Sequence, residues 1–133
     1  MTRHVTHAIL LAVALMSTVG CWQRDIQVTD QPVSIISESM GIGTPVQKGD
    51  LVTIDYKAML LDGKVVQEHD GYRFEVGKGQ VILAFDESLP GMRKGGIRRI
   101  ESPPHKHWGR QGYGNIPPGS RLIFEIHLIA VNE

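Results

Sequence analysis

The stretch LVTIDYKAML, residues 51–60, decides the fold class of this chain. Its apolar residues alternate with polar ones, so that Val52, Ile54 and Tyr56 share one face of an extended chain. A period of two is typical of a strand with one buried side. Asp62-Gly63 follows, and this pair favours a tight turn because both residue types tolerate positive φ. The segment therefore predicts the first strand of a β-hairpin.

The alternation continues along the chain. Residues 72–76 alternate in the same way, residues 64–67 are predicted as the second arm of the hairpin, and residues 97–101 and 121–131 as further strands. The last of these carries apolar residues on both faces, so we expect it to lie centrally in a sheet. Only residues 82–89 show helical spacing, and Pro90-Gly91 ends that segment. About five strands and one short helix predict an α+β domain, in which a twisted antiparallel half-barrel wraps on one short α-helix.

The composition fits one globular domain. The 133 residues contain 14 Lys+Arg and 14 Asp+Glu, and this balance argues against a polyanion such as nucleic acid as partner. A single cysteine, Cys21, excludes an intrachain disulfide and a cysteine-based zinc site. The length suffices for one domain of ordinary size and is short for two.

The N-terminal segment has the pattern of an export signal. Residues 8–19 form an apolar run that spans about 18 Å as a helix, well short of the roughly 30 Å hydrocarbon core of a membrane. We therefore expect residues 1–20 to be a signal peptide. Gly20 before Cys21 resembles the cleavage box of bacterial lipoproteins, which implies that Cys21 is lipidated. The alternative is ordinary secretory cleavage nearby, with the cysteine incidental.

The segment after the cysteine is polar and aperiodic. Residues 21–32 (CWQRDIQVTDQP) are typical of a tether between a lipid anchor and a domain at residues 33–133. Trp22 stands after the cysteine in place of Asp. In lipoproteins of Gram-negative bacteria this implies sorting to the outer membrane, so we expect a periplasmic protein that is lipid-anchored there.

Few residues suit acid–base or metal chemistry. His105 and His107 lie two residues apart without a third ligand at a recognisable spacing, so we interpret them as part of a solvated loop; a metal site is the alternative. The basic run from Arg93 to Arg99 is interpreted as a charged strand with its preceding turn. By contrast, Trp108 and Tyr113 lie in a Gly/Pro-rich loop, where burial is not the default, and they suggest an exposed apolar pocket.

Several motifs together resemble the FKBP-type peptidyl-prolyl cis-trans isomerases, which are macrolide-binding immunophilins. In order, they are VTIDYKAMLLDGK (52–64), YRFEVGKGQVILAFDESLPGMRKGG (72–96), RRIESPP (98–104) and GYGNIPPGSRLIFEIHL (112–128). The resemblance covers residues 33–133. It implies a twisted antiparallel sheet around one short helix, isomerase activity on proline-containing polypeptides, weak macrolide binding, and no cofactor.

The resemblance also implies a set of site residues. The positions that match the catalytic pocket are Tyr56, Val66, Gln67, Ile82, Phe85, Trp108 and Phe124. The positions that match further substrate contacts are Tyr72, Phe74, Val81, Tyr113 and Ile116. The backbone N–H of Ile82 is expected to bind a carbonyl of the ligand.

The chain departs from the family pattern at several of these positions. Phe85 stands where a larger aromatic residue, usually Trp, forms the pocket floor, and Gln67 replaces a carboxylate. Trp108 replaces a tyrosine whose hydroxyl donates to the ligand, and residues 68–71 form a shorter loop than in the best-known members.

These features leave more than one function open. The first hypothesis is an isomerase that assists the folding of exported proteins by removing water from the X–Pro imide in an apolar pocket. The alternative is a proline-directed peptide-binding or chaperone module with little or no catalysis, which the departures favour. A third, weaker hypothesis is recruitment to an envelope assembly through the Arg93 to Arg99 segment.

Overall fold

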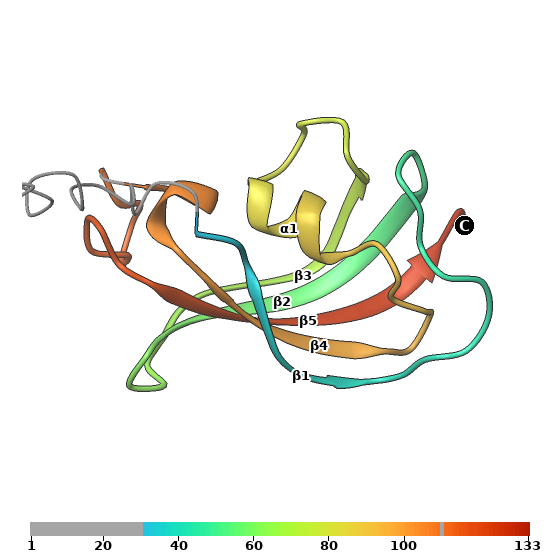
Figure 1. Ribbon diagram of the computed structural model, residues 1–133, viewed down its shortest axis with the longest axis horizontal. Coiled ribbons are helices and arrows are strands. Elements are labelled where there is room, and N and C mark those ends of the chain that lie inside the picture. Colours follow the sequence, from blue (N-terminus) through green and yellow to red (C-terminus); the bar gives the residue numbers. More distant parts are fainter. Residues whose placement is uncertain (1–30, 110) are drawn as a thin grey trace, which may run out of the picture.

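The computed structural model describes residues 31–109 and 111–133, which form one antiparallel sheet and one α-helix (Figure 1). The strands are β1 (Ser34–Ser39), β2 (Leu51–Leu60), β3 (Val65–Glu75), β4 (Ile97–Ser102) and β5 (Leu122–Val131). The helix α1 (Leu83–Ser88) lies over one face of the curved sheet, and a 3-10 turn, η3 (Pro104–Lys106), follows β4. The predicted α+β half-barrel is confirmed.

The last strand in sequence lies in the middle of the sheet. The strand order is β1-β4-β5-β2-β3, and every neighbouring pair is antiparallel. On β5 the even-numbered residues from Leu122 to Leu128 are buried, while its other face is partly exposed. The central position predicted from the apolar residues on both faces of this segment is therefore confirmed.

The core lies between the sheet and α1. On β2 the alternate residues Val52, Ile54 and Tyr56 are buried, as the period of two predicts. The helix has only six residues, too few to be stable by itself, so packing of its buried residues must hold it in place. Phe85 within the helix and Leu89 at its C-cap supply that packing, and burial of each such side chain stabilises the fold by roughly 1.5–3 kcal/mol.

The strand β3 is continuous where two segments and a loop were predicted. Tyr72 pairs with Ile54 and His69 pairs with Tyr56, so the register shifts between these pairs. The extra residues form a β-bulge, and Gly71 within it has a φ of 68° and donates its N–H to Asp55 Oδ1 at 2.8 Å. The predicted loop at residues 68–71 is therefore wrong, because a bulge carries these residues without ending the strand.

The strand β1 forms one edge of the sheet and was not predicted as a separate element. All six of its residues are exposed, and it pairs with β4 alone. Its sequence SIISES buries no face, which leaves no clear alternation to detect. The predicted number of strands agrees with the structure only because the two halves of β3 were counted separately.

Arg98 on β4 is a buried cation that fixes the end of α1. The residue is 7% exposed, and its Nε and Nη2 donate to Glu38 Oε2 at 2.9 and 2.8 Å. Its Nη1 donates to the carbonyl oxygens of Ser88 and, at 3.2 Å, Pro90. Because helix C-termini leave carbonyls without partners, this guanidinium satisfies groups that the fold would otherwise bury unpaired.

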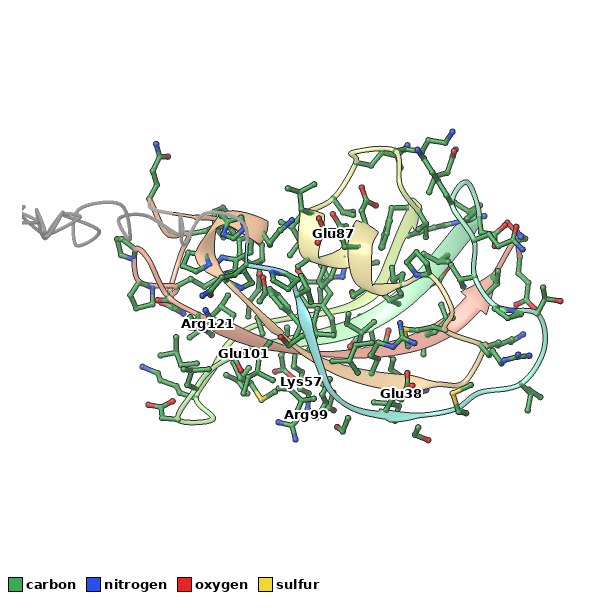
Figure 2. All side chains as sticks on the ribbon, in the orientation of Figure 1. Glu38, Lys57, Glu87, Arg99, Glu101 and Arg121 are labelled. Atoms are coloured by element: carbon green, nitrogen blue, oxygen red, sulfur yellow. The ribbon has the colours of Figure 1, made fainter. Side chains whose placement is uncertain are left out.

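Arg99, the next residue, points the other way. It forms a loose pair with Glu125 at 3.7 Å, and Figure 2 shows it with Lys57 on the face of the sheet opposite α1. The segment from Arg93 to Arg99 therefore does not form one basic surface. Its interpretation as a charged strand with a turn holds for Arg99, whereas Arg98 belongs to the interior.

Several expectations lie outside the described residues. The signal peptide at residues 1–20, the lipidated Cys21 and the tether as far as residue 30 all fall there. Within residues 31–109 and 111–133, no helix is long and apolar enough to cross a membrane.

Candidate functional site

Three buried rings from three different elements form the floor of the candidate site. Phe85 comes from α1, Tyr56 from β2 and Phe124 from β5, and all three side chains are buried. The ring centroids of Phe85 lie 4.9 Å from Tyr56 and 5.1 Å from Phe124, with interplanar angles of 62° and 74°. These edge-to-face contacts are the favoured geometry of aromatic pairs. We call this group the aromatic floor.

On one side of the floor, β3 supplies a rim. Tyr72 is half-buried and lies 5.9 Å from Tyr56, while Phe74 is buried 6.4 Å from Phe85. His69 lies nearly parallel to the Tyr56 ring, 6.2 Å from its centroid. The bulge in β3 places this histidine beside the site, and no recognisable sequence pattern identified it as a site residue.

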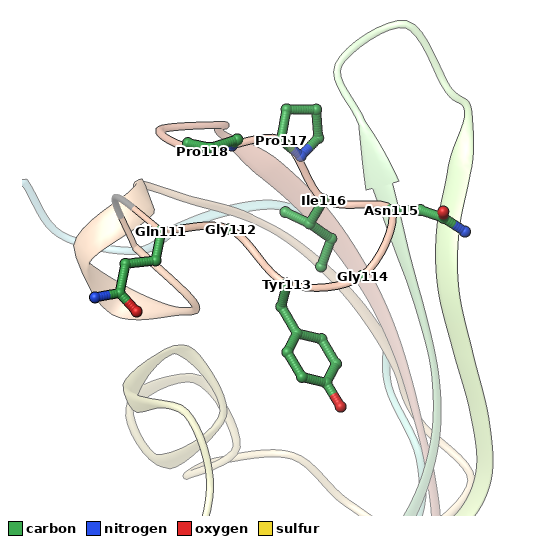
Figure 3. A pocket seen from close by; sticks show the side chains of 8 residues that line it. All are labelled: Gln111, Gly112, Tyr113, Gly114, Asn115, Ile116, Pro117 and Pro118. Carbon is green, nitrogen blue, oxygen red and sulfur yellow. The ribbon is translucent and has the colours of Figure 1, made fainter.

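On the other side, a loop between η3 and β5 supplies the wall. The Trp108 ring lies 6.2 Å from Phe124 and stacks on Tyr113 at 5.5 Å with an interplanar angle of 14°. Tyr113 is 58% exposed, so the stack has one solvent-facing side. Figure 3 shows the Tyr113 side chain pointing out of the loop. Of the apolar residues that the sequence singled out in this loop, Tyr113 and Ile116 line an open hollow, whereas Trp108 is not among its lining residues.

A hollow of about 400 Å³ lies in the same loop and is lined by residues 111–118 (Figure 3). Tyr113 and Ile116 shape it through two mutual backbone hydrogen bonds of 3.1 and 2.8 Å. Ile116 is buried at its base, whereas Tyr113 is exposed at its mouth. Gly112 has a φ of 72°, and a Cβ there would lie 2.3 Å from the Ile116 carbonyl oxygen. This position therefore requires glycine.

The residue before α1 presents a free backbone donor. Ile82 is the N-cap residue, and its N–H donates to no acceptor among the described residues. Asp86 holds the preceding turn, because its carboxylate accepts the N–H groups of Gly77 and Gly79 at 2.8 and 3.0 Å. The turn and the first turn of α1 thus form one unit, and the half-buried Val81 packs against the core beside it.

Val66 and Gln67 lie at a register shift near the start of β3. Gln67 pairs with Ala58 and Val65 pairs with Met59, so Val66 lies between the two pairs, and its side chain is buried. Oε1 of Gln67 is buried and has no hydrogen-bond partner among residues 31–109 and 111–133. An amide therefore occupies this position with one polar end unpaired.

His107 is a residue whose place the sequence reading missed. Its ring is half-buried 6.2 Å from Phe124 and 6.0 Å from Trp108, and its Nε2 lies 2.8 Å from the Ser120 carbonyl oxygen. The interpretation of His105 and His107 as a solvated loop is therefore wrong. No group of three or more His, Cys, Asp or Glu side chains in the described part of the chain has a geometry that could hold a metal ion.

Two pKa shifts follow from this burial. Burial lowers the pKa of His107 below its ordinary value; the hydrogen bond to Ser120 opposes this, and nearby His105 adds to it. Burial also raises the pKa of the Tyr56 hydroxyl, with smaller contributions from Tyr72 and Tyr113. Both side chains are therefore neutral near pH 7, and the floor and its surroundings form an uncharged, desolvated surface.

The structure brings together the residues that the sequence singled out. Those in or packed against the core that contains the aromatic floor are Tyr56, Val66, Tyr72, Phe74, Val81, Ile82, Phe85, Trp108 and Phe124. Gln67 is placed only by its pairing with Ala58 on β2. Tyr113 and Ile116 belong to the adjoining loop. The assembly offers apolar surface, ring edges and a backbone donor, and it does not offer an acid–base pair.

Comparisons with known proteins agree with this arrangement. Residues 43–129 match the model of the FKBP-type peptidyl-prolyl cis-trans isomerase family. The peptidyl-prolyl cis-trans isomerase FKBP15-2 of Arabidopsis thaliana is 32% identical over 129 residues, which cover 93% of this chain and 79% of the relative. FK506-binding protein 4 of Aspergillus fumigatus is 36% identical over 102 residues, or 74% of this chain.

The FK506-binding protein 4 of Mycosarcoma maydis is 35% identical over 108 residues, which cover 77% of this chain and 29% of the relative. The match to the Aspergillus fumigatus protein covers only 21% of that relative, so the chain spans about a fifth of its length. The family match covers more than half of the chain and includes α1, β2 to β4, most of β5 and the aromatic floor. The chain therefore belongs to the FKBP-type peptidyl-prolyl cis-trans isomerase family.

Proposed function

We propose that this chain is an active peptidyl-prolyl cis-trans isomerase that acts on proline-containing segments of exported polypeptides. The observation that carries this proposal is the aromatic floor, in which Tyr56, Phe85 and Phe124 are buried edge to face, with Trp108, which stacks on Tyr113, 6.2 Å from Phe124. A proline ring is apolar and fits such a surface. The unpaired N–H of Ile82, three residues before Phe85, supplies a donor for a substrate carbonyl.

The proposed mechanism needs no proton transfer. The imide bond rotates slowly because resonance gives it double-bond character, with a barrier of about 18–20 kcal/mol. Rotation uncouples the nitrogen from the carbonyl, so the twisted imide is less dipolar than the planar one. Removal of water therefore favours the twisted state over the planar state, and interactions stronger in the transition state than in the ground state accelerate the reaction. The neutral Tyr56 and His107 keep the surroundings of the floor uncharged.

The test is acceleration of cis–trans exchange in Xaa-Pro peptides, measured with full-length protein by NMR exchange without a coupling protease. We expect exchange above the uncatalysed rate, and its loss in Trp108→Ala. Ile129→Ala is the matched control, because Ile129 lies on β5 but is exposed on the face away from the floor. Exchange at the background rate in folded wild-type protein contradicts the proposal.

The second candidate function is a proline-directed peptide-binding or chaperone module with little catalysis. The observation that favours it is Gln67, whose buried Oε1 stands unpaired where the family resemblance implies a carboxylate. Binding of an Xaa-Pro peptide without faster exchange supports this candidate over the first. A macrolide titration in the same samples measures whether the pocket accepts such ligands, and weak binding is the expectation.

We also propose that the protein is exported and anchored to the outer membrane through a lipid on Cys21. The support is the sequence alone: an apolar run at residues 8–19 followed by Gly20 and Cys21. Labelled palmitate should be incorporated into the wild-type protein and not into Cys21→Ala. Equal labelling of both proteins, or of neither, contradicts the anchor.

A further inference from the structure

The loop that carries the wall of the site is closed by two hydrogen bonds at its neck. The Gly119 N–H donates to the Gly109 carbonyl at 3.1 Å, and His107 Nε2 lies 2.8 Å from the carbonyl oxygen of Ser120. The second bond is the one made by a side chain. Trp108 is adjacent to this neck, so the position of its ring depends on how the neck is held.

The ring of His107 contacts both the floor and the wall. Its centroid lies 6.2 Å from Phe124, with an interplanar angle of 64°, and 6.0 Å from Trp108. One imidazole thus connects β5, the start of the loop and its end at Ser120. Displacement of this ring would remove a packing partner of Trp108 and open the neck at the same time.

The hydrogen bond to Ser120 determines which ring nitrogen of His107 carries the proton. A carbonyl oxygen only accepts, so the contact with Ser120 places a proton on Nε2. Nδ1 is then an unprotonated acceptor, and it is buried without a partner among the described residues. Protonation would place an N–H group and a positive charge where no described acceptor is available, which disfavours the charged form in the folded state.

The charged groups on the neighbouring elements do not offset the cost of protonating His107. On η3, Lys106 pairs with Glu87 of α1 at 2.6 Å, and before β5, Arg121 pairs with Glu101 of β4 at 2.7 Å. Both carboxylates thus already face a cation. His105, a further titratable neighbour, has a buried Nε2 without a partner in the described part of the chain and adds no negative charge. From β5, the residue that faces the ring is Phe124.

We propose that His107 is a positioning residue, whose neutral ring latches the neck of the loop and thereby holds Trp108 over the aromatic floor. The latch opens on acidification, because protonation adds a buried charge and a second N–H, on Nδ1, that has no described acceptor, and this cost outweighs the retained bond from Nε2 to Ser120. Burial lowers the pKa of His107, which is the direction expected when the folded protein disfavours the protonated ring. The contribution of the neutral His107 ring to folding stability is fully present above the pKa of histidine in the unfolded chain, about 6.5. This contribution decreases as the pH falls below that value. This inference rests on the proposed function for its kinetic consequence, but the motion of Trp108 can be measured without activity.

The first experiment follows the fluorescence of Trp108 in full-length protein with Trp22→Phe, which leaves one tryptophan. Between about pH 7.5 and pH 4.5, the range in which imidazoles titrate, we expect an emission change in the parent protein while far-UV circular dichroism stays constant. In His107→Gln the emission should stay constant, because the amide keeps a donor for Ser120 and does not titrate. His105→Gln and His69→Gln are the matched controls, and both should keep the transition.

The second experiment measures peptide exchange kinetics over the same pH range. In the parent protein we expect KM for an Xaa-Pro peptide to rise about threefold or more on acidification, whereas in His107→Gln it should change less than about twofold. His107→Ala should weaken peptide binding at every pH, since it removes the ring. An emission change in His107→Gln equal to that of the parent overturns the latch, and so does a constant emission in the parent.

The two proposals can fail separately. Absence of catalysis at every pH, with a Trp108 transition that His107→Gln abolishes, refutes the isomerase activity and leaves the latch. Clear catalysis with the same pH profile in the parent and in His107→Gln refutes the latch and leaves the activity.

Discussion

Replacement of Arg98 by methionine should destabilise the domain far more than the same change at Arg99. The two residues are neighbours on β4, so their strand propensity and chain position are nearly equal. Arg98 is 7% exposed and donates to Glu38 and to two carbonyls at the end of α1, whereas Arg99 makes one loose contact with Glu125 at 3.7 Å. Methionine retains part of the apolar stem and none of the donors in both cases.

The magnitude follows from burial. Removal of one partner of a buried pair costs roughly 3–5 kcal/mol, and the partial exposure of Glu38 places this case at the lower end, about 3 kcal/mol. The carbonyls of Ser88 and Pro90 also lose their donor, which is consistent with a value no smaller than that. For Arg99→Met the exposed pair predicts a loss of about 0.5 kcal/mol or less.

Urea unfolding followed by circular dichroism measures the difference. With a slope of about 1–1.5 kcal/mol per molar urea for a domain of this size, Arg98→Met should lower the midpoint by about 2–3 M and Arg99→Met by less than about 0.5 M. Glu38→Gln should fall between them, near 1 kcal/mol, because Arg98 keeps its two carbonyl partners. If the free energies of unfolding of Arg98→Met and Arg99→Met differ by less than about 0.5 kcal/mol, Arg98 is not a buried residue that stabilises the end of α1.

Three further changes test the site. Gly112→Ala should strain the loop by about 1–2 kcal/mol, since its Cβ would lie 2.3 Å from the Ile116 carbonyl oxygen at positive φ. We expect the urea midpoint to fall by about 0.7–2 M and kcat/KM for Xaa-Pro peptides to fall with it, and unchanged kinetics would contradict this. Gln67→Asp should bury a carboxylate without a partner and lower stability by about 1–3 kcal/mol, with no gain in exchange rate; a tenfold gain would show that the missing charge limits catalysis. Asp86→Ala should lower the free energy of unfolding by about 2 kcal/mol, because two loop N–H groups lose a charged acceptor, and Asp86→Asn should recover part of that loss in the same urea assay.

The parts of the fold that depend on local pattern could be predicted from the sequence. The alternation of apolar and polar residues in β2 predicts the burial of Val52, Ile54 and Tyr56, because successive side chains of a strand point to opposite faces. The central place of β5 follows in the same way from apolar residues on both of its faces. The family motifs added the grouping of Tyr56, Phe85 and Phe124, which local pattern alone reads as core.

The parts that depend on distant partners could not be predicted. His69, Asp70 and Gly71 look like a loop, and only the pairing with β2 turns them into a bulge within β3. His107 looks solvated because its neighbours are polar, yet Phe124 covers its ring from a strand that begins fifteen residues later.

The position of β5 has a consequence for how the chain can be made. This strand separates β4 from β2, so the two halves of the sheet have no hydrogen-bonded connection until residues 122–131 are in place (Figure 1). Synthesis proceeds from the N-terminus at about 5–20 residues per second, so a growing polypeptide that has released β1 to β4 still lacks the strand that joins them. Closure of the sheet therefore waits for residues 122–131, and a chain that lacks them can form only the separate strand pairs β1–β4 and β2–β3.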